Sequence, residues 1–147
     1  MKFVVDSNVL FTFFWKNSVF NKIILHYDLN LYSPEFALGE IKKYSLEIRK
    51  KTKLSTAEFN LLREKLLETV TFVPIGVYKE KFTKSEEFIK DLDQNEASSL
   101  LEDIDFLALS LELNCPLWTN DRLLKKQNLV KILTTSEIIE VLDLAVL

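Results

Sequence analysis

Two aspartates each stand at the end of a short apolar run. Asp6 closes the run at residues 3–5, and Asp121 follows the segment at residues 117–120. Short apolar runs are typical of strands that are buried on both faces of a parallel sheet. Because parallel strands end at the same edge, we expect the two carboxylates to lie close together there. The pair predicts an acidic pocket that holds a divalent cation.

Two further carboxylates are expected at this edge. Glu40 lies in the second turn of the helix that follows the second predicted strand, and that helix starts at the same edge. Asp103 precedes a helix that is almost wholly apolar, so the helix body is expected to be buried and its acidic start to lie at a rim. Glu102 and Asp105 flank it, and the sequence leaves open which of these three acids faces Asp6.

A cluster of carboxylates is stable in the charged form only when cations neutralise it, because like charges raise each other's pKa. All-oxygen ligands suit hard ions, which makes Mg²⁺ or Mn²⁺ the expected cofactor. Such an ion keeps positions for water and for a phosphate oxygen, so the chemistry predicted is hydrolysis of phosphodiesters. Each acid alone has a simpler interpretation as a helix cap or a solvated side chain, and only the joint arrangement favours a metal site.

The composition predicts one domain over residues 1–147 and excludes several classes of site. Hydrophobic residues make up 48% of the chain, which is enough for a packed core. The two glycines cannot build a glycine-rich phosphate loop, and the single cysteine cannot form an internal disulfide. His26 is the only histidine and has no metal-ligand spacing. Without a signal peptide or a long apolar span, the chain is predicted to be cytoplasmic and not to enter a membrane.

Short apolar strands alternate with amphipathic helices. We expect strands at residues 2–5, 29–32, 69–74, 117–119 and 130–133. We expect Ser7 to cap a first helix, the segment at residues 33–35 to begin a helix that runs to about residue 51, and Ser55 to form a capping box. Further helices are expected at residues 77–90, at residues 95–113 with a break near Glu102, and after a cap at Thr135 or Ser136. This alternation predicts an α/β fold, a three-layer α/β/α sandwich with a mainly parallel central sheet.

The sequence resembles the PIN-domain ribonucleases, a family that includes toxins of VapBC toxin–antitoxin pairs and stand-alone proteins. The matching pieces occur in the family's order: Asp6 with its flanking residues 4–8, Ser33 and Pro34 followed by Glu40, the segment at residues 103–111, and the segment at residues 117–121. Asp105 departs from the pattern, because many relatives have a small or neutral residue there. Because of this departure, the sequence leaves the identity of the third acid open.

The resemblance implies Mg²⁺- or Mn²⁺-dependent cleavage of single-stranded RNA. It implies that the acidic quartet, which is both catalytic and metal-binding, consists of Asp6, Glu40, Asp103 and Asp121, with Asp105 as the alternative third acid. It also implies that polar side chains next to the quartet orient ligands or water, and these are Asn8, Thr119 and Asn120.

A phosphate backbone needs cations to bind it. The best local patch lies on the helix that carries Glu40, and its predicted RNA-binding residues are Lys42, Lys43, Arg49 and Lys50, with Tyr44 among them as an aromatic that can stack on a base. Lysines at the end of a helix also complement its dipole, so a purely structural role is the competing interpretation.

The leading hypothesis is a metal-dependent endoribonuclease, with a toxin role as a weaker extension that requires a cognate antitoxin. An alternative is a PIN-fold module that binds RNA or a partner with weak or no catalysis, and a third is a metal-dependent phosphatase. A homodimer is also predicted. The phenylalanines and leucines of residues 9–24 fit the core best, and they also suit a surface for a second copy or a partner helix.

Overall fold

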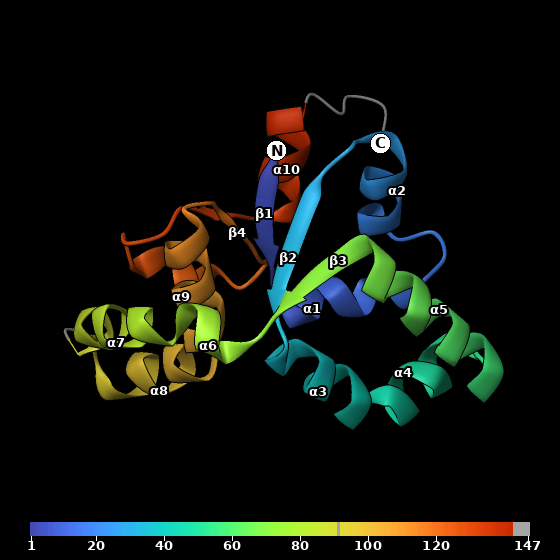
Figure 1. The fold of residues 1–147 in the computed structure, drawn as a ribbon, viewed down its shortest axis with the longest axis horizontal. Coiled ribbons are helices and arrows are strands. Elements are labelled where there is room, and N and C mark those ends of the chain that lie inside the picture. The colour runs from blue at the N-terminus through green and yellow to red at the C-terminus, as the bar shows by residue number, and fades with distance from the viewer. Residues whose placement is uncertain (91, 143–147) are drawn as a thin grey trace.

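The computed structural model describes residues 1–90 and 92–142, with the backbone alone at positions 88, 98, 99 and 102. At its centre is a sheet of five parallel strands in the order β3-β2-β1-β4-β5 (Figure 1). The strands are β1 (Lys2–Val5), β2 (Asn30–Pro34), β3 (Val70–Val73), β4 (Leu117–Trp118) and β5 (Ile132–Leu133). Helices surround the sheet, so the predicted α/β fold is confirmed.

β1 occupies the middle of the sheet because its side chains are apolar on both faces. Val4 lies opposite Tyr32 of β2 on one side and Leu117 of β4 on the other. Phe3, Val4 and Val5 are almost completely buried. The chain leaves β1 for β2 and β3 in one direction and returns to β4 and β5 in the other. The carboxyl end of β1 is therefore the point where the strand order reverses, which is where ligands bind in open parallel sheets.

One group of helices lies on the left of the sheet in Figure 1. Its central member, α9 (Ile104–Leu113), packs on β1, β2 and β4. Nearly every side chain in the middle of α9 is buried, which explains its apolar sequence. Around it lie α6 (Ile75–Tyr78), η2 (Lys79–Lys81), α7 (Phe82–Ile89) and α8 (Gln94–Glu102).

A second group of helices lies on the right of the sheet in Figure 1. It contains α1 (Ser7–Phe11), η1 (Thr12–Phe14), α2 (Val19–His26), α3 (Phe36–Lys43), α4 (Ser45–Thr52) and α5 (Thr56–Thr69). The C-terminal part adds η3 (Arg122–Lys126) after β4 and α10 (Thr135–Leu142) after β5. α10 packs against α2.

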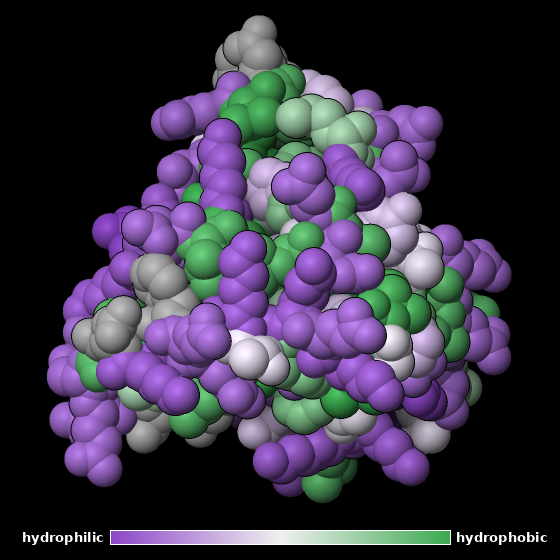
Figure 2. Space-filling model, turned by 60° about the vertical axis from the view of Figure 1, so that its left-hand side comes forward, coloured by the Kyte–Doolittle hydropathy of each residue, from purple (hydrophilic) through white to green (hydrophobic). Residues whose placement is uncertain are grey.

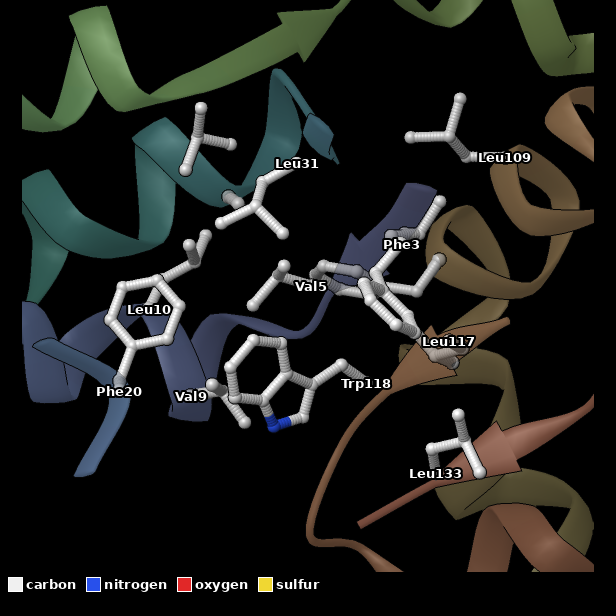
Figure 3. Close-up of a cluster of buried hydrophobic side chains, with 14 of the residues drawn as sticks. Phe3, Val5, Val9, Leu10, Phe20, Leu31, Leu109, Leu117, Trp118 and Leu133 are labelled. Carbon is white, nitrogen blue, oxygen red and sulfur yellow. The ribbon is translucent and has the colours of Figure 1, made fainter. Parts of the chain in front are cut away.

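Aromatic side chains join the second group of helices to the sheet. The ring of Phe20 in α2 lies 5.3 Å from that of Trp118 in β4, and Figure 3 shows Val9 beside the same indole. Phe14 of η1 stacks on Phe59 of α5 with 4.7 Å between the ring centroids. Most of the phenylalanines in residues 9–24 therefore belong to the core, which was the preferred prediction.

Local starts and ends of helices differ from the predictions in places. Ser7 is the first residue of α1 and not its cap, because Asp6 occupies the cap position without making a side-chain capping bond. Ser33 and Pro34 belong to β2, and the Ser33 hydroxyl donates to the carbonyl oxygen of Val5 at 2.9 Å. Thr134, rather than Thr135 or Ser136, caps α10 by accepting from the backbone N–H of Glu137.

Two long helices expected from the sequence are broken, and two other features are as predicted. The helix expected up to residue 51 is interrupted at Tyr44, and residues 77–90 fall into parts of α6, η2 and α7. The predicted break near Glu102 separates α8 from α9. The capping box at Ser55 is present, with both of its hydrogen bonds to Glu58.

Polar side chains cover most of the face shown in Figure 2, with smaller hydrophobic patches between them. In the parts of the chain that the structure describes, no helix is both long and apolar enough to cross a membrane.

Candidate active site at the carboxyl edge of the sheet

Asp6 lies directly beyond the end of β1 and is only 4% exposed. The hydroxyl of Thr119, just beyond β4, donates to its Oδ2 at 2.6 Å. The backbone N–H of Ser7 also donates to the Asp6 carboxylate. The neighbouring strands β1 and β4 therefore fix this carboxylate in one orientation.

Thr119 connects Asp6 to Asp121. Its side chain is fully buried, and its oxygen accepts from the backbone N–H of Asp121 at 3.1 Å while its hydroxyl donates to Asp6. The Oδ1 of Asp121 in turn accepts from the backbone N–H of Leu123 at 3.0 Å, which caps η3. Thr119 thus positions both acids, and its predicted role in orienting ligands or water stays a prediction.

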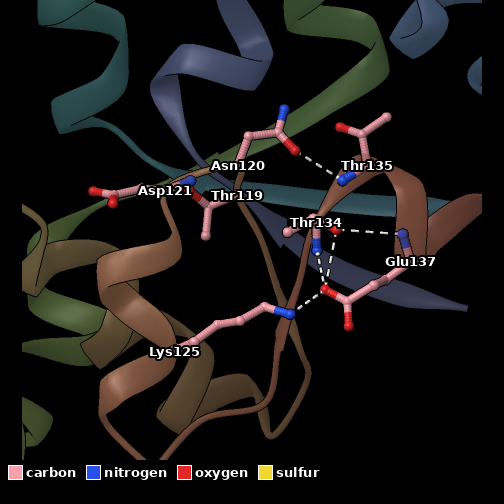
Figure 4. Close-up of polar contacts among 7 residues, drawn as sticks. All are labelled: Thr119, Asn120, Asp121, Lys125, Thr134, Thr135 and Glu137. Carbon is pink, nitrogen blue, oxygen red and sulfur yellow. Dashed lines mark hydrogen bonds and ion pairs between the residues drawn. The ribbon is translucent and has the colours of Figure 1, made fainter.

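Asn120 points away from Asp121 and has a different task. Figure 4 shows the two side chains on opposite sides of the chain. The Oδ1 of Asn120 accepts from the backbone N–H of Thr135 at 2.9 Å, so it ties the segment after β4 to the start of α10. Nearby, Glu137 pairs with Lys125 and accepts from Thr134, which further fixes this loop. The structure therefore gives Asn120 a structural contact outside the pocket.

Glu40 is held from the side of α1. The hydroxyl of Ser7 donates to Glu40 Oε1 at 2.7 Å. α3 begins two residues after β2 ends, so Glu40 in its second turn lies at the same edge of the sheet as Asp6. Ser7 therefore bridges the two acids, because its backbone binds Asp6 and its side chain binds Glu40.

Asp103 and Asp105 have different surroundings. Asp103 lies at the junction of α8 and α9 and lines the same pocket as Asp6. Asp105 does not line it, and its Oδ2 accepts from the hydroxyl of Tyr78 at 2.7 Å. The side chain of Glu102 lies outside the described part of the chain. Between Asp103 and Asp105, the geometry favours Asp103 as the third acid.

All four acids of the predicted quartet line one pocket of about 660 Å³. Asn8 and Lys43 also line it, whereas Lys42, Arg49 and Lys50 do not. Other walls come from Phe36, Tyr44 and Leu123. The pocket is therefore rich in carboxylates and carries one lysine at its side.

The pKa of Asp6 is raised above its ordinary value, mainly because the carboxyl group is buried. Hydrogen bonds from Thr119 and from the Ser7 amide oppose the increase, and the charges of Glu40 and Asp121 add to it. A bound cation would act in the opposite direction, since it stabilises the carboxylate form.

The residues fit a divalent cation by the chemistry of their donors, because four carboxylates supply oxygen ligands only. Within residues 1–90 and 92–142, however, no three acidic, histidine or cysteine side chains are already grouped as a metal site. The four acids share a pocket without converging on one point. Mg²⁺ usually keeps several waters and takes only one or two carboxylates, which suits such a spread arrangement.

Sequence reasoning missed two side chains that position the acids. Ser7 was expected to cap a helix, although its place next to Asp6 already puts it at the carboxyl edge. Tyr78 was not singled out, and no spacing in the sequence relates it to Asp105. Burial and the Asp105 carboxylate raise the pKa of the Tyr78 hydroxyl, so it stays a donor at neutral pH.

The predicted RNA-binding residues separate into different places around α3 and α4. Lys43 borders the acidic pocket, and its Nζ lies 5.2 Å from the centroid of the Tyr44 ring. Lys42 and Arg49 line a second, smaller pocket. Lys50 is exposed on α4 and borders neither of these pockets.

The PIN-domain family profile matches residues 4–142. The chain belongs to the PIN-domain family. PIN domains are generally metal-dependent nucleases that use divalent ions. The match includes the second half of β1, the other four strands and all four acids of the pocket, so the resemblance seen in the sequence is confirmed.

This PIN domain is also similar in fold to a solved structure, VapBC2 from Rickettsia felis bound to a DNA fragment from their promoter. The alignment covers 91% of this chain and 98% of the other, with a TM-score of 0.60 and 16% sequence identity. At that identity the likeness concerns the fold. No protein with a curated description matches the chain.

Proposed function

We propose that this PIN domain is an endoribonuclease that hydrolyses phosphodiester bonds of single-stranded RNA with Mg²⁺ or Mn²⁺. The observation that carries the proposal is the shared pocket of Asp6, Glu40, Asp103 and Asp121 at the carboxyl edge of the sheet. These four carboxylates would hold one or two ions. Family membership supports the nuclease class, and the pocket supplies the residues.

The chain's own groups prepare the site before any ligand binds. Thr119 and the Ser7 amide hold Asp6, and the Ser7 hydroxyl holds Glu40, so two carboxylates are oriented without reorganisation. A divalent ion supplies charge neutralisation at the phosphate and lowers the pKa of water. Lys43 at the pocket side is placed to attract the phosphate backbone.

The test is cleavage of a labelled single-stranded RNA in Mn²⁺ by the native chain and by Asp6→Asn. We expect the substitution to reduce the rate by at least about 100-fold, because a lost metal ligand removes several kcal/mol of charge stabilisation. Lys131→Gln, at the opposite edge of the sheet, serves as a control for preparation and folding. Equal cleavage by the native chain and Asp6→Asn would disprove the site.

The competing hypotheses give different results in the same experiments. A module that binds RNA or a partner without catalysis would show no cleavage, and calorimetry would show no Mn²⁺ binding at millimolar concentration. A metal-dependent phosphatase would hydrolyse small phosphate esters and leave RNA intact. We therefore propose to run the RNA, the ester and the Mn²⁺ titration on the same preparation.

We also propose that the domain acts as a toxin whose cognate antitoxin binds a groove between α2 and α5. The groove has a volume of about 700 Å³, and its lining is mainly apolar: Phe13, Phe14, Ile24, Leu25, Leu54 and Leu62. Leu25 is 80% exposed, which is unusual for a leucine beside such a groove. An amphipathic helix of a partner would cover it.

Leu25→Glu tests this partner proposal, provided that the neighbouring gene encodes a candidate antitoxin. The substitution should prevent co-purification of the two chains and leave cleavage of RNA unchanged, because Leu25 lies outside the acidic pocket. Retained co-purification would refute the groove as the binding site. Light scattering of the isolated chain tests the predicted homodimer separately, and localisation in the cytoplasm would be checked with a tagged chain.

A further inference from the structure

A second polar pocket lies between α3, α4 and α5, with a volume of about 180 Å³. The side of α3 and α4 contributes Lys42, Ser45 and Arg49. The side of α5 contributes Thr56, Phe59, Asn60 and Arg63, whose spacing of three and four residues places them on one helix face. Three cations and no acid line this pocket, although the whole chain has a net charge of -3.

Each of the two arginines in this pocket has a buried donor nitrogen without a hydrogen-bond acceptor. The Nε atoms of Arg49 and Arg63 are buried and have no hydrogen-bond partner among the described residues. No ion pair in those residues involves either guanidinium. Buried donors are nearly always satisfied in native proteins, so two arginines that line one pocket and each carry such a donor indicate an acceptor that comes from outside the chain.

A phosphate group supplies the hydrogen-bond acceptors and the negative charge that this pocket lacks. Its oxygens accept bidentate hydrogen bonds from guanidinium groups, and a negative charge is what three cations attract. Hydroxyls of Ser45 and Thr56 and the amide of Asn60 add neutral donors. Thr56 is also the first residue of the 14-residue helix α5, whose dipole favours an anion at that end.

The position of the pocket relates it to the acidic site. Lys42 lines this pocket and Lys43, the next residue, lines the acidic pocket. The two pockets therefore flank the same turn at the end of α3. We propose that the pocket of Lys42, Arg49 and Arg63 binds a backbone phosphate of the RNA strand whose scissile bond lies in the acidic pocket, an assignment that rests on the proposed nuclease function.

The first arm of the test needs no RNA and no catalysis. The chain has three arginines, and Arg122 lies outside this pocket, so the arginine Nε–H resonances provide their own control. On titration with inorganic phosphate, the signals of Arg49 and Arg63 should shift together, and that of Arg122 should stay in place. Three equal shifts, or none, would overturn an anion site here.

The second arm measures binding of a single-stranded RNA by fluorescence anisotropy in EDTA, where a metal-dependent nuclease does not cut. Arg63→Gln should weaken binding about 3- to 10-fold and reduce the slope of log K against log salt by about 0.7, the value for one phosphate contact on a single strand. Lys131→Gln removes an equal charge at the amino-terminal edge of the sheet and should change neither quantity. Arg63→Lys should restore the slope and only part of the affinity.

These arms separate the sources of the phosphate and the two proposals. If phosphate shifts the Arg49 and Arg63 resonances but Arg63→Gln does not change RNA binding, the pocket is a site for free phosphate. That result would overturn its assignment to the RNA backbone. Equal effects of Arg63→Gln and Lys131→Gln would also overturn it. Because binding is measured without metal, a chain that binds RNA through Arg63 but never cleaves it refutes the nuclease function alone. Thermal melting of each variant checks that it is folded.

Discussion

The acidic pocket and the pocket of Lys42, Arg49 and Arg63, here called the arginine pocket, lie on either side of α3. They are built in different ways. In the acidic pocket, Asp6 and Glu40 already have hydrogen-bond donors from the protein, and Thr119 and Ser7 fix them. In the arginine pocket, the buried nitrogens of Arg49 and Arg63 have no acceptors from the described residues. The first arrangement orients reactive groups in advance, and the second leaves its donors for a ligand.

Secondary structure explains this contrast. Strand ends place residues of neighbouring strands within hydrogen-bond distance, so the acids share partners such as Thr119. The arginines extend from two helices, α4 and α5, that line the same pocket. The strand-end acids Asp6 and Asp121 are therefore fixed by neighbouring strands, whereas the arginine side chains depend on how the helices pack.

The largest expected effect is a loss of RNA cleavage when an acid of the acidic pocket is replaced. Asp103→Asn should reduce RNA cleavage by about 100-fold, since it removes a carboxylate from the pocket. Asp105→Asn should change the rate by less than about threefold, since Tyr78 holds Asp105 away from the pocket. Single-turnover cleavage in Mn²⁺ measures both variants. The reverse order of effects would make Asp105 the third acid.

A second effect concerns the hydroxyl that supports the acidic pocket. Thr119→Val should lower the free energy of unfolding by about 2 kcal/mol, because it removes the hydroxyl donor of the buried Asp6 carboxylate and the acceptor of the Asp121 N–H. Thr119→Ser keeps the hydroxyl and should lose much less. Urea unfolding measures the difference, and a valine variant as stable as the serine variant would contradict this role.

Two adjacent lysines allow the pockets to be compared directly. Lys43→Gln should lower kcat about tenfold, because Lys43 borders the acidic pocket. Lys42→Gln should raise KM about threefold and leave kcat unchanged, because Lys42 borders the arginine pocket. Steady-state kinetics with the same RNA measures both variants. If the two substitutions alter kcat equally, the pockets do not divide catalysis and binding.

The smallest effect is on the pH dependence of stability. The raised pKa of Asp6 means that the folded chain holds a proton that the unfolded chain has released, so the native protein loses stability as pH rises from the ordinary value of 3.8 towards the raised pKa. In EDTA, the Tm of Asp6→Asn minus the native Tm should therefore increase over that pH window. Above the window, this difference should stay constant. Mn²⁺ should reverse the difference at neutral pH, because only the native carboxylate binds the ion. A Tm difference that is independent of pH would contradict the raised pKa.

Residues of the site were predicted where a local pattern marks them, and missed where their neighbours in space lie far away along the chain. Asp6 and Asp121 were predicted because each follows an apolar run, and the strand pattern also indicated the sheet edge. Tyr78 and Arg63 were not predicted, since the residues beside them, Asp105 and Arg49, belong to other helices whose packing no local pattern specifies. The break of the long helix at Tyr44 was missed for the same reason, because residues on both sides of it favour helix.

The sequence by itself predicted the parallel sheet, the family resemblance and the strand-end acids Asp6 and Asp121, because strand periodicity and strand-end position are local properties. Tertiary structure placed Asp103 in the acidic pocket and Asp105 outside it, connected Thr119 to two acids at once, and placed neighbouring Lys42 and Lys43 in separate pockets. The physical reason is that hydrogen bonding and burial depend on distances between elements, and the packing of helices on the sheet sets those distances.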